Sequence, residues 1–265
     1  MTTALSAVWS NLTPVKRSNM IAVASGKGGV GKTWFAITLA HALAKSDRRT
    51  LLFDGDLGLA NVDIQLGLMP SYDLGSVLAG RLTLQQAAMR FEEAGFDIIA
   101  GRSGSGRLAT IPPRRLQDIT GDLTKIAGTY DRLILDLGAG VDRTVRHLAR
   151  CANTCLLVTT DEPTALTDAY AFIKLTQMER STSDIRIVIN MANSVREGER
   201  TYNTLLKACE GFLKISPPLM GVIRRDAKVR EAIRNQTSIL TRFPNTEAAT
   251  DVEAIANALL KLEQE

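Results

Sequence analysis

The chain has 265 residues, of which 45% are hydrophobic and 23% are charged, and its formal net charge is +4. This composition is typical of an ordinary globular protein and excludes a disordered or fibrous chain. The length suits one α/β domain or two small ones, and no apolar run reaches the ~18 residues that a membrane-spanning helix needs. The positive charge permits contact with phosphates or anionic lipid without requiring it.

The N-terminal tail, residues 1–19, has no continuous apolar core after a basic start, so we expect no secretory signal. If the tail is helical, Leu5, Val8, Trp9 and Leu12 share one face, which would dock on a partner or on the protein's own core. The three cysteines of the chain are too few and too scattered for a disulfide framework or a zinc ribbon, which favours a reducing cytoplasm.

Strands and helices are predicted to alternate along the rest of the chain. The first strand, residues 20–24, ends in a glycine-rich turn, and apolar residues near a 3.6 spacing predict a helix at 33–45. Strands this apolar on both faces, separated by helices, indicate a mainly parallel sheet that is covered on both sides. Further strands are predicted at 50–53, 96–100, 132–135, 154–158, 185–189 and 219–223, and further helices at 112–128, 142–151, 165–180, 197–213, 227–235 and 247–262.

A glycine- and serine-rich stretch at 101–106 is the only candidate for a linker inside this pattern. It is six residues long, so we interpret it as a loop at a strand end rather than a boundary between domains. The chain contains no internal repeat and no low-complexity tract. We therefore expect one α/β domain at 20–265 after the tail at 1–19.

Residues 25–33, Ser-Gly-Lys-Gly-Gly-Val-Gly-Lys-Thr, fit the phosphate-binding motif G-x-x-x-x-G-K-[ST] at every fixed position. Because the motif leaves a strand and opens a helix, its backbone N–H groups can turn toward one anion and the helix N-terminus adds partial positive charge. Lys32 would hold the β- and γ-phosphates, and the Thr33 hydroxyl would hold Mg²⁺. The predicted ATP-binding residues of this loop are Gly26, Lys27, Gly28, Gly29, Val30, Gly31, Lys32, Thr33 and Trp34.

The early lysine, Lys27, makes this loop more specific. The deviant form G-K-G-G-V-G-K-T and the sequence after it resemble the MinD/ParA family of ATPases. The resemblance implies the P-loop NTPase fold, a three-layer sandwich with a mainly parallel, roughly seven- to eight-stranded sheet, and Mg²⁺-dependent ATP hydrolysis by a homodimer that forms in the ATP state. In this family the early lysine reaches across the dimer, so Lys27 would stabilise the phosphoryl group of the partner's nucleotide.

Three aspartates lie at predicted strand ends. Asp54 and Asp56, two residues apart, would point the same way in an extended chain, and Asp136 ends the strand at 132–135. Ligands bind at this edge in open α/β sheets. The resemblance implies that Asp56 orients the attacking water, that Asp54 supports the Mg²⁺ shell and that Asp136 holds Mg²⁺ through water. A helix N-cap is the alternative role for Asp56.

Two later strand ends are predicted to receive the base. Asn190 closes the strand at 185–189, and the resemblance makes its amide the group that reads adenine. The turn that contains Arg224 and Asp226 matches the family's loop beside the adenine. The sequence departs from the family pattern at both places, because Met191 stands where the family has arginine and Arg224 where it has proline.

The resemblance covers residues 20–262 and is most marked for the flagellar-number regulators of the FlhG/FleN subgroup. It implies an ATP-dependent dimerisation switch with slow hydrolysis, which regulates the position or number of a bacterial polar structure. Flagella are the expected structure, and a protein partner would stimulate turnover or be regulated. The tail lacks the N-terminal motif of that subgroup, which leaves another polar system open. The stretches that carry the resemblance are 54–63, 67–68, 74–80, 159–170 and 229–232.

Two basic clusters keep other partners open. Arg143, Arg146, His147 and Arg150 share a stripe on the helix after the glycine turn at 138–140, and this stripe is either a surface that depends on nucleotide state or a solvated face. A second basic cluster, later in the chain, supports an alternative function. The protein would then be a ParA-like partition ATPase that binds DNA non-specifically in its ATP state. This second cluster comprises Arg224, Arg225, Lys228, Arg230, Arg234 and Arg242.

The last residues, 252–265, are apolar on one face but acidic at the end, and anionic lipid repels acidic flanks. We therefore expect a packed terminal helix and disfavour direct membrane contact. The expected location is the cytoplasm, with recruitment to a cell pole or the inner membrane face left open. A nitrogenase-reductase-like enzyme is disfavoured, because Cys151 and Cys155 are offset from the positions where a shared cluster would need cysteines.

Overall fold

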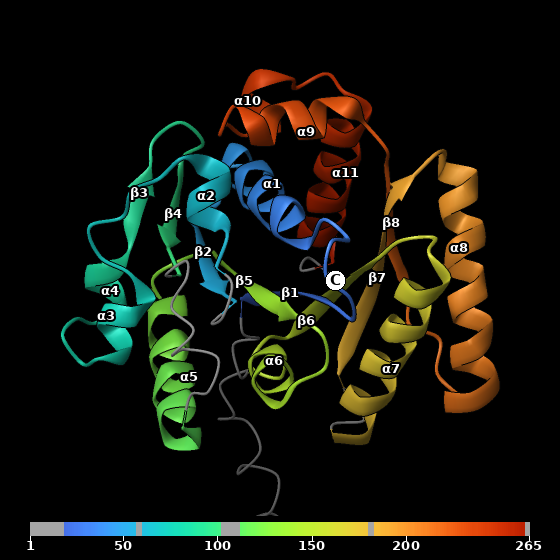
Figure 1. Cartoon of the computed structure of the whole chain (residues 1–265), viewed down its shortest axis with the longest axis horizontal. Helices are drawn as coiled ribbons and strands as arrows, with labels where there is room; N and C mark the ends of the chain where they lie inside the picture. Colours follow the sequence, from blue (N-terminus) through green and yellow to red (C-terminus); the bar gives the residue numbers. More distant parts are fainter. Residues whose placement is uncertain (1–18, 57–59, 102–111, 180–182, 263–265) are drawn as a thin grey trace, which may run out of the picture.

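The structure of the chain is a computed structural model that describes residues 19–56, 60–101, 112–179 and 183–262. In these residues eight strands form one sheet, with the order β3-β4-β2-β5-β1-β6-β7-β8 (Figure 1). All neighbouring strands are parallel except the edge pair β3 and β4, so the predicted, mainly parallel sheet is confirmed. The strands are β1 (Met20–Ser25), β2 (Thr50–Gly55), β3 (Met89–Phe91), β4 (Phe96–Ile99), β5 (Arg132–Ala139), β6 (Thr154–Thr159), β7 (Asp184–Ala192) and β8 (Leu219–Arg224).

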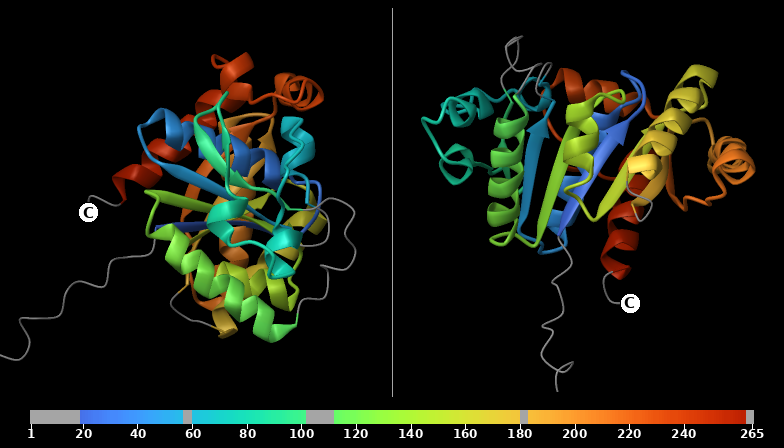
Figure 2. Two further views of the ribbon diagram at one scale, coloured as in Figure 1. Left: turned by 90° about the vertical axis from the view of Figure 1, so that its left-hand side faces the viewer. Right: turned by 90° about the horizontal axis from the view of Figure 1, so that it is seen from below.

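Helices cover both faces of the sheet, which confirms the three-layer α/β sandwich (Figures 1 and 2). One face is buried under a cluster that includes Phe35 and Val252, and the other under a cluster that includes Leu123 and Phe172. Because both faces are covered, the strands are apolar on both sides. The first layer contains α1 (Lys32–Lys45), α10 (Ile239–Arg242) and α11 (Glu247–Lys261), with α9 (Ala227–Arg234) at its rim, and the second contains α5 (Pro113–Ala127), α6 (Arg143–Ala149), α7 (Pro163–Glu179) and α8 (Val195–Ala208).

The segment between β2 and β4 differs most from the sequence prediction. It holds the short helices α2 (Val62–Leu66), α3 (Leu74–Leu78) and α4 (Leu84–Ala87) and the edge strand β3, none of which is predicted. Elements of five residues or fewer are too short to show a hydrophobic period. A local signal did exist, because the Thr83 and Gln86 side chains form a capping box at the start of α4.

One predicted helix ends differently. The helix expected at 197–213 is α-helical only to Ala208, and a π-helical turn, Cys209–Leu213, follows it. Lys214 then stops the turn in a left-handed conformation, with φ of 59°. No helix in the described ranges is long and apolar enough to cross a membrane. The tail to residue 18 and most of the loop at 101–106 lie outside the described residues, so those two interpretations stay predictions.

Candidate nucleotide-binding site

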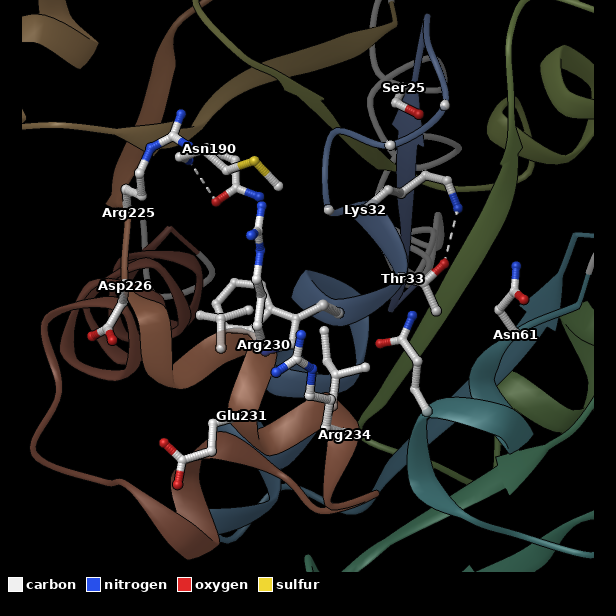
Figure 3. A pocket seen from close by; sticks show the side chains of 18 of the residues that line it. Ser25, Lys32, Thr33, Asn61, Asn190, Arg225, Asp226, Arg230, Glu231 and Arg234 are labelled. Atoms are coloured by element: carbon white, nitrogen blue, oxygen red, sulfur yellow. Dashed lines mark hydrogen bonds between the residues drawn. The ribbon is translucent and has the colours of Figure 1, made fainter.

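A cavity of about 1380 Å³ lies at the carboxyl ends of the central strands, where the predicted site residues converge (Figure 3). β1 lies between β5 and β6 in the sheet, so the loops after these strands meet at this edge. The phosphate loop, the segment after β2 and α9 all contribute side chains to the wall. The predicted residues that line it are Gly28, Gly29, Gly31, Lys32, Thr33, Trp34, Asp56, Asn190, Arg224 and Asp226.

The phosphate loop leaves β1 and opens α1, as predicted. Gly31 precedes the helix with φ of 85°, and a Cβ on it would lie 2.4 Å from Asn190 Nδ2. A Cβ on Gly26 would lie 2.3 Å from the backbone carbon of Asp168. No side chain in the described residues caps α1, so its first N–H groups remain available for an anion. The two glycines therefore allow a backbone cradle that a side chain would obstruct.

Lys32, which lines the cavity, forms a buried ion pair with Asp136. Lys32 Nζ lies 2.7 Å from Asp136 Oδ1 and 3.5 Å from Thr33 Oγ1. Burial raises the pKa of Asp136, whereas the neighbouring Lys32 charge opposes that rise. The other carboxylate oxygen, Oδ2, is buried without a hydrogen-bond partner among the described residues. An orphaned carboxylate oxygen near a threonine hydroxyl is a hard-oxygen donor set, which fits Mg²⁺.

Asp54 is fully buried, and its carboxylate holds the backbone of the segment that follows β2. Oδ1 accepts a hydrogen bond from the N–H of Asp56 at 3.2 Å, and Oδ2 accepts from the N–H groups of Asn61 and Val62 at 3.2 Å. Burial, followed by the charge of Asp136, raises the pKa of Asp54 to about 7. Both carboxylate oxygens of Asp54, which was predicted to support the Mg²⁺ shell, thus accept hydrogen bonds from backbone N–H groups.

Asp56 reaches the cavity from the end of this anchored strand. Its side chain lines the wall beside the carboxyl end of β5, since a Cβ on Gly138 would lie 3.6 Å from Asp56 Oδ1. Gly138 was expected in a turn but lies within β5. The end of β2 and the carboxyl end of β5 are therefore neighbours at this edge of the sheet. A carboxylate at this position can accept a hydrogen bond from a water in the cavity.

Lys27 lies at the outer side of the phosphate loop and points toward the start of α7. Its Nζ donates hydrogen bonds to Glu162 Oε2 at 2.6 Å and to Thr164 Oγ1 at 2.7 Å. Lys27 and Glu162 line a smaller cavity of about 170 Å³ together with Gly28 and Val30. Neither Glu162 nor Thr164 is assigned a site role by the sequence analysis, because they follow Lys27 by 135 and 137 residues.

The predicted base-reading residues are engaged within the chain. Asn190 Nδ2 donates to the Val30 carbonyl at 2.8 Å, and Asn190 Oδ1 accepts from the N–H of Met191 at 2.8 Å. Arg224 donates to both carboxylate oxygens of Asp251, from Nε at 2.9 Å and from Nη2 at 2.8 Å. Asn190 therefore ties β7 to the phosphate loop, and the guanidinium of Arg224 is bound to α11.

Three arginines line the cavity although the sequence motifs did not predict them as nucleotide-binding residues. Arg225 precedes α9, and Arg230 and Arg234 lie on it, with their side chains facing the cavity (Figure 3). The spacing of four residues places Arg230 and Arg234 on one helix face, which is the signal that could have found them. Asp226 caps the same helix by accepting from the N–H of Lys228 at 2.8 Å.

Both basic clusters are partly neutralised inside the chain. Arg146 Nε lies 2.9 Å from Glu179 Oε1, and Arg150 Nη1 lies 3.9 Å from Glu179 Oε2, so α6 is tied to the end of α7. In the later cluster, Lys228 Nζ lies 2.6 Å from Glu231 Oε2. These pairs reduce the free positive charge that either stripe offers to a partner.

Comparisons with known proteins identify the family and the fold. The family model of the CobQ/CobB/MinD/ParA nucleotide binding domain matches residues 21–239. Antiactivator FleN of Pseudomonas aeruginosa is 38% identical over 237 residues, which cover 89% of this chain and 84% of that protein. Flagellum site-determining protein YlxH of Helicobacter pylori is 30% identical over 248 residues, covering 93% and 83%. The septum site-determining protein MinD of Pyrococcus horikoshii OT3, solved with Mg-ADP, matches with a TM-score of 0.78 and 26% identity over 92% of this chain and 97% of that chain.

Proposed function

The chain belongs to the CobQ/CobB/MinD/ParA family of nucleotide-binding proteins, and from that membership we propose that it is an ATP-dependent dimerisation switch with slow hydrolysis. It is an ATPase that uses ATP and Mg²⁺. The proposal rests on one observation above all, which is that the phosphate loop, Asp56 and the Lys32–Asp136 pair meet at one strand edge. Phosphoryl transfer depends mainly on positioning and charge, and these groups supply both.

The phosphate half of the nucleotide binds at the N-terminus of α1. Backbone N–H groups of the loop surround the phosphates, and Lys32 neutralises the β- and γ-phosphates. The incoming phosphates compete with Asp136 for this lysine, because its Nζ is only 2.7 Å from Asp136 Oδ1. Thr33 and Asp136 would hold Mg²⁺, which would supply positive charge against the negative charge that develops on the phosphate oxygens.

Hydrolysis is assigned to Asp56, which orients the attacking water in the cavity. Asp54 contributes by holding the N–H groups of Asp56, Asn61 and Val62, so that the water-orienting carboxylate is presented from an anchored backbone. Asp56 also lies beside Gly138, so movement of the glycine turn after γ-phosphate loss would reach it directly.

The dimer is assigned to Lys27. In the ATP state two subunits would face each other and Lys27 would leave Glu162 to reach the nucleotide of the partner subunit. The side chain of Lys27 is 37% exposed, so this exchange of partners needs no rearrangement of the core. Hydrolysis would then release the two subunits.

The switch would determine the site or number of a bacterial structure. One relative, YlxH, is named as a flagellum site-determining protein, and another, FleN, is named as an antiactivator. We extend this role to flagella in the present chain, with a protein partner that stimulates turnover or is regulated. The flagellar assignment is distinguished from another polar machine by whether deleting the gene changes flagellar number or position.

A membrane anchor at the C-terminal end is not part of this proposal. Val252, Ile255 and Leu259 of α11 are buried in the core, so the apolar face of this helix is already covered. The protein would act in the cytoplasm, and a partner would recruit it to a pole or to the inner membrane face. Non-specific DNA binding stays the second candidate function. The basic cluster that would bind DNA has less free positive charge, because Arg224 pairs with Asp251 and Lys228 pairs with Glu231.

The dimerisation switch is tested by separating nucleotide binding from hydrolysis. Asp56→Ala with ATP and Mg²⁺ should accumulate a dimer on size exclusion, because the nucleotide binds but is not cleaved. Lys32→Ala is the control and should stay monomeric, since it cannot hold the phosphates. A monomeric Asp56→Ala protein at saturating ATP would show that the switch mechanism is wrong.

A further inference from the structure

A groove between α7 and α8 plays no part in the proposed nucleotide site. Its volume is about 430 Å³, and its described lining residues all differ from those that line the nucleotide cavity. Figure 1 shows the two helices side by side at one end of the sheet. Besides two threonines, the wall is apolar and consists of Leu166 and Tyr170 from α7, Leu205 and Ala208 from α8, and Phe212.

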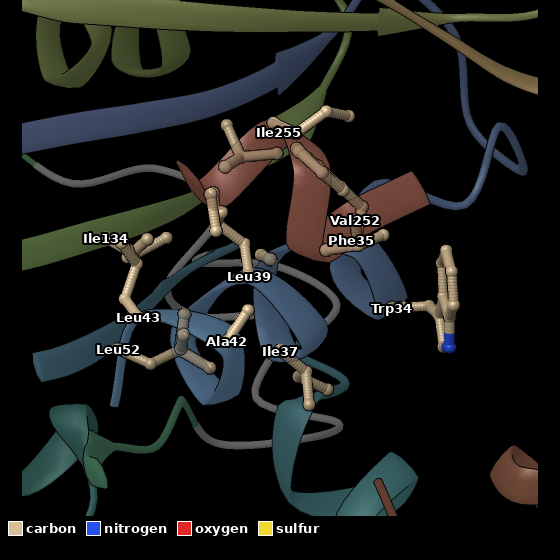
Figure 4. Close-up of a cluster of buried hydrophobic side chains, with 14 of the residues drawn as sticks. Trp34, Phe35, Ile37, Leu39, Ala42, Leu43, Leu52, Ile134, Val252 and Ile255 are labelled. Atoms are coloured by element: carbon tan, nitrogen blue, oxygen red, sulfur yellow. The ribbon is translucent and has the colours of Figure 1, made fainter. Parts of the chain in front are cut away.

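Phe212 and Met178 extend this apolar surface into solvent. Phe212, on the π-helical turn after α8, is 80% exposed, and Met178 is 74% exposed about two turns after Tyr170 on α7. On the other face of the sheet, by contrast, the large apolar side chains of α1 and α11 pack together, as Phe35 and Val252 do (Figure 4). A groove whose apolar wall continues into exposed aromatic and thioether side chains indicates an interaction site.

Three cations flank the groove. Lys174 follows Tyr170 by one turn on α7. On α8, Arg200 lies one turn before the lining residue Thr204, and Lys207 lies one turn after it. Because side chains one turn apart are neighbours on a helix surface, each cation lies next to a lining residue. All three cations are exposed, and none of them forms an ion pair with another of the described residues.

The acidic residues of the two lining stretches, 166–174 and 200–212, are engaged elsewhere. Asp168 lies where α7 meets the phosphate loop, since a Cβ on Gly26 would lie 2.3 Å from the backbone carbon of Asp168. Glu210 Oε1 accepts a hydrogen bond from Ser216 Oγ at 3.0 Å. A partner with acidic side chains would therefore meet positive charge that the chain itself does not neutralise.

The N-terminal tail of the chain is a poor complement to this charge. Residues 1–18 include an apolar stripe but no aspartate or glutamate, and Lys16 and Arg17 add positive charge. Like charges across an interface oppose binding. The groove therefore fits a segment of another protein, with apolar side chains and acidic flanks, better than it fits the tail.

The turns of α7 that line the groove also touch the phosphate loop. Thr164 Oγ1 accepts a hydrogen bond from Lys27 Nζ at 2.7 Å, and Leu166 follows Thr164 by two residues. About one turn later, a Cβ on Gly26 would lie 2.8 Å from the backbone nitrogen of Ala169. A ligand in the groove and a nucleotide in the loop would therefore contact the same segment of α7.

We propose that the groove between α7 and α8 is the docking site for an amphipathic helix of a partner protein. Apolar side chains of that helix enter the groove against Phe212, and its acidic flanks pair with Lys174, Arg200 and Lys207. Grooves of this kind take a helix through apolar anchors at i, i+3, i+4 and i+7. The inference names the surface for the protein partner of the proposed switch, and only its link to the phosphate loop rests on that proposed function.

The first test measures fluorescence anisotropy of three labelled peptides of equal length against the full chain. One peptide has leucine at i, i+3, i+4 and i+7 with glutamate at the other positions, the second has lysine in place of glutamate, and the third is residues 1–18 of this chain. We expect the glutamate peptide to bind with a dissociation constant of about 10–100 μM and the other two at least about tenfold more weakly. No binding of the glutamate peptide, or equal or tighter binding of either other peptide, would overturn the proposal.

A second comparison places the glutamate peptide in the groove. Phe212→Ala should weaken its binding about tenfold, and Lys174→Glu about three- to tenfold. Met69→Ala is the control, because Met69 is 95% exposed but does not line the groove, and it should stay within about twofold of the wild type. Mg-ADP affinity should be the same in all three variants, which checks that they are folded. Unchanged peptide binding in Phe212→Ala, or an equal loss in Met69→Ala, contradicts the assignment.

The link to the phosphate loop has its own measurement. Because both ligands contact α7, saturating Mg-ATP should change the affinity for the glutamate peptide by about threefold or more. Lys32→Ala should bind the peptide without responding to Mg-ATP. An unchanged affinity in a wild-type protein that does bind Mg-ATP would refute the link. If the wild type binds no Mg-ATP, the proposed nucleotide site fails, whereas the groove is judged separately by the Phe212→Ala comparison.

Discussion

Lys27 Nζ lies 2.6 Å from Glu162 Oε2, so the lysine proposed to act on a partner's nucleotide is held by a carboxylate of its own chain. The contact lowers the pKa of Glu162, through the hydrogen bond from Lys27 first and its charge second. Both side chains are solvent-accessible, and exposed ion pairs are weak. Glu162 therefore restrains Lys27 in a way that a phosphate can overcome.

Glutamates at both ends of α7 form ion pairs with side chains of other segments. Glu162 stands just before the helix and holds Lys27, whereas Glu179 at its end holds Arg146 of α6 at 2.9 Å. α6 follows β5 and the short turn that contains Gly140. The start of α7 is thus joined to the phosphate loop, and its end is joined to α6. In the proposed switch these are the two segments that move.

Removing the Glu162 charge should favour the dimer. Glu162→Gln leaves a neutral side chain, so Lys27 is released at less cost, and the ATP concentration for half-maximal dimer should fall by about two- to threefold. Size exclusion over an ATP series measures this, with Asp161→Asn as the control that removes the same charge from the adjacent position. An unchanged or higher ATP requirement for Glu162→Gln would mean that the pair does not restrain the lysine.

Replacing Lys27 should separate binding from turnover. Lys27→Ala should bind Mg-ADP with wild-type affinity, because the loop backbone and Lys32 hold the phosphates, and its ATP hydrolysis should fall about a hundredfold. Phosphate release assays measure the rate. The control is Lys45→Ala, which removes another exposed lysine in an ion pair, at 2.6 Å from Glu253 Oε1, away from the cavity. Retained hydrolysis in Lys27→Ala would refute its role across the dimer.

Asp54 should make the nucleotide-free protein less stable as the pH rises. The pKa of its carboxyl increases from 3.8 to about 7 on folding, because burial and then the charge of Asp136 disfavour the ionised form. Between about pH 4 and 7 the folded state binds more protons than the unfolded state, so the free energy of unfolding decreases as the pH rises. Thermal unfolding between pH 5 and 8 should show this fall, and Asp54→Asn should flatten it. An equally steep profile in the variant contradicts the assignment.

Gly31 should tolerate no side chain. Gly31→Ala combines a φ of 85° with a Cβ 2.4 Å from Asn190 Nδ2, so the loop must shift and Mg-ADP affinity should fall at least about tenfold. Calorimetric titration measures the affinity. Gly121→Ala on α5 is the matched control, because its added Cβ meets no heavy atom within 4 Å and should stabilise the helix by about 0.5–1 kcal/mol. Wild-type affinity in Gly31→Ala would show that the strain is relieved elsewhere.

The sequence alone identified the phosphate loop, the α/β class and most strands and helices. Each of these is encoded by neighbouring residues: glycines at a helix start, or apolar runs bounded by turns. The short elements between β2 and β4 were not predicted, because helices of four or five residues are too short to show a hydrophobic period. The convergence of Asp54 and Asp136, which lie toward the carboxyl ends of β2 and β5, could also be predicted, since parallel strands end at one edge.

The partners of the site side chains were decided only by the tertiary structure. Asn190 contacts Val30 across 160 residues, and Lys27 contacts Glu162 across 135 residues. Strand order brings Asp54 and Asp136 into register on β2 and β5, and helix packing sets Arg224 on Asp251. A local pattern specifies backbone conformation, which depends on adjacent residues. Which atoms of distant side chains meet depends on how the whole sheet and its helices are packed.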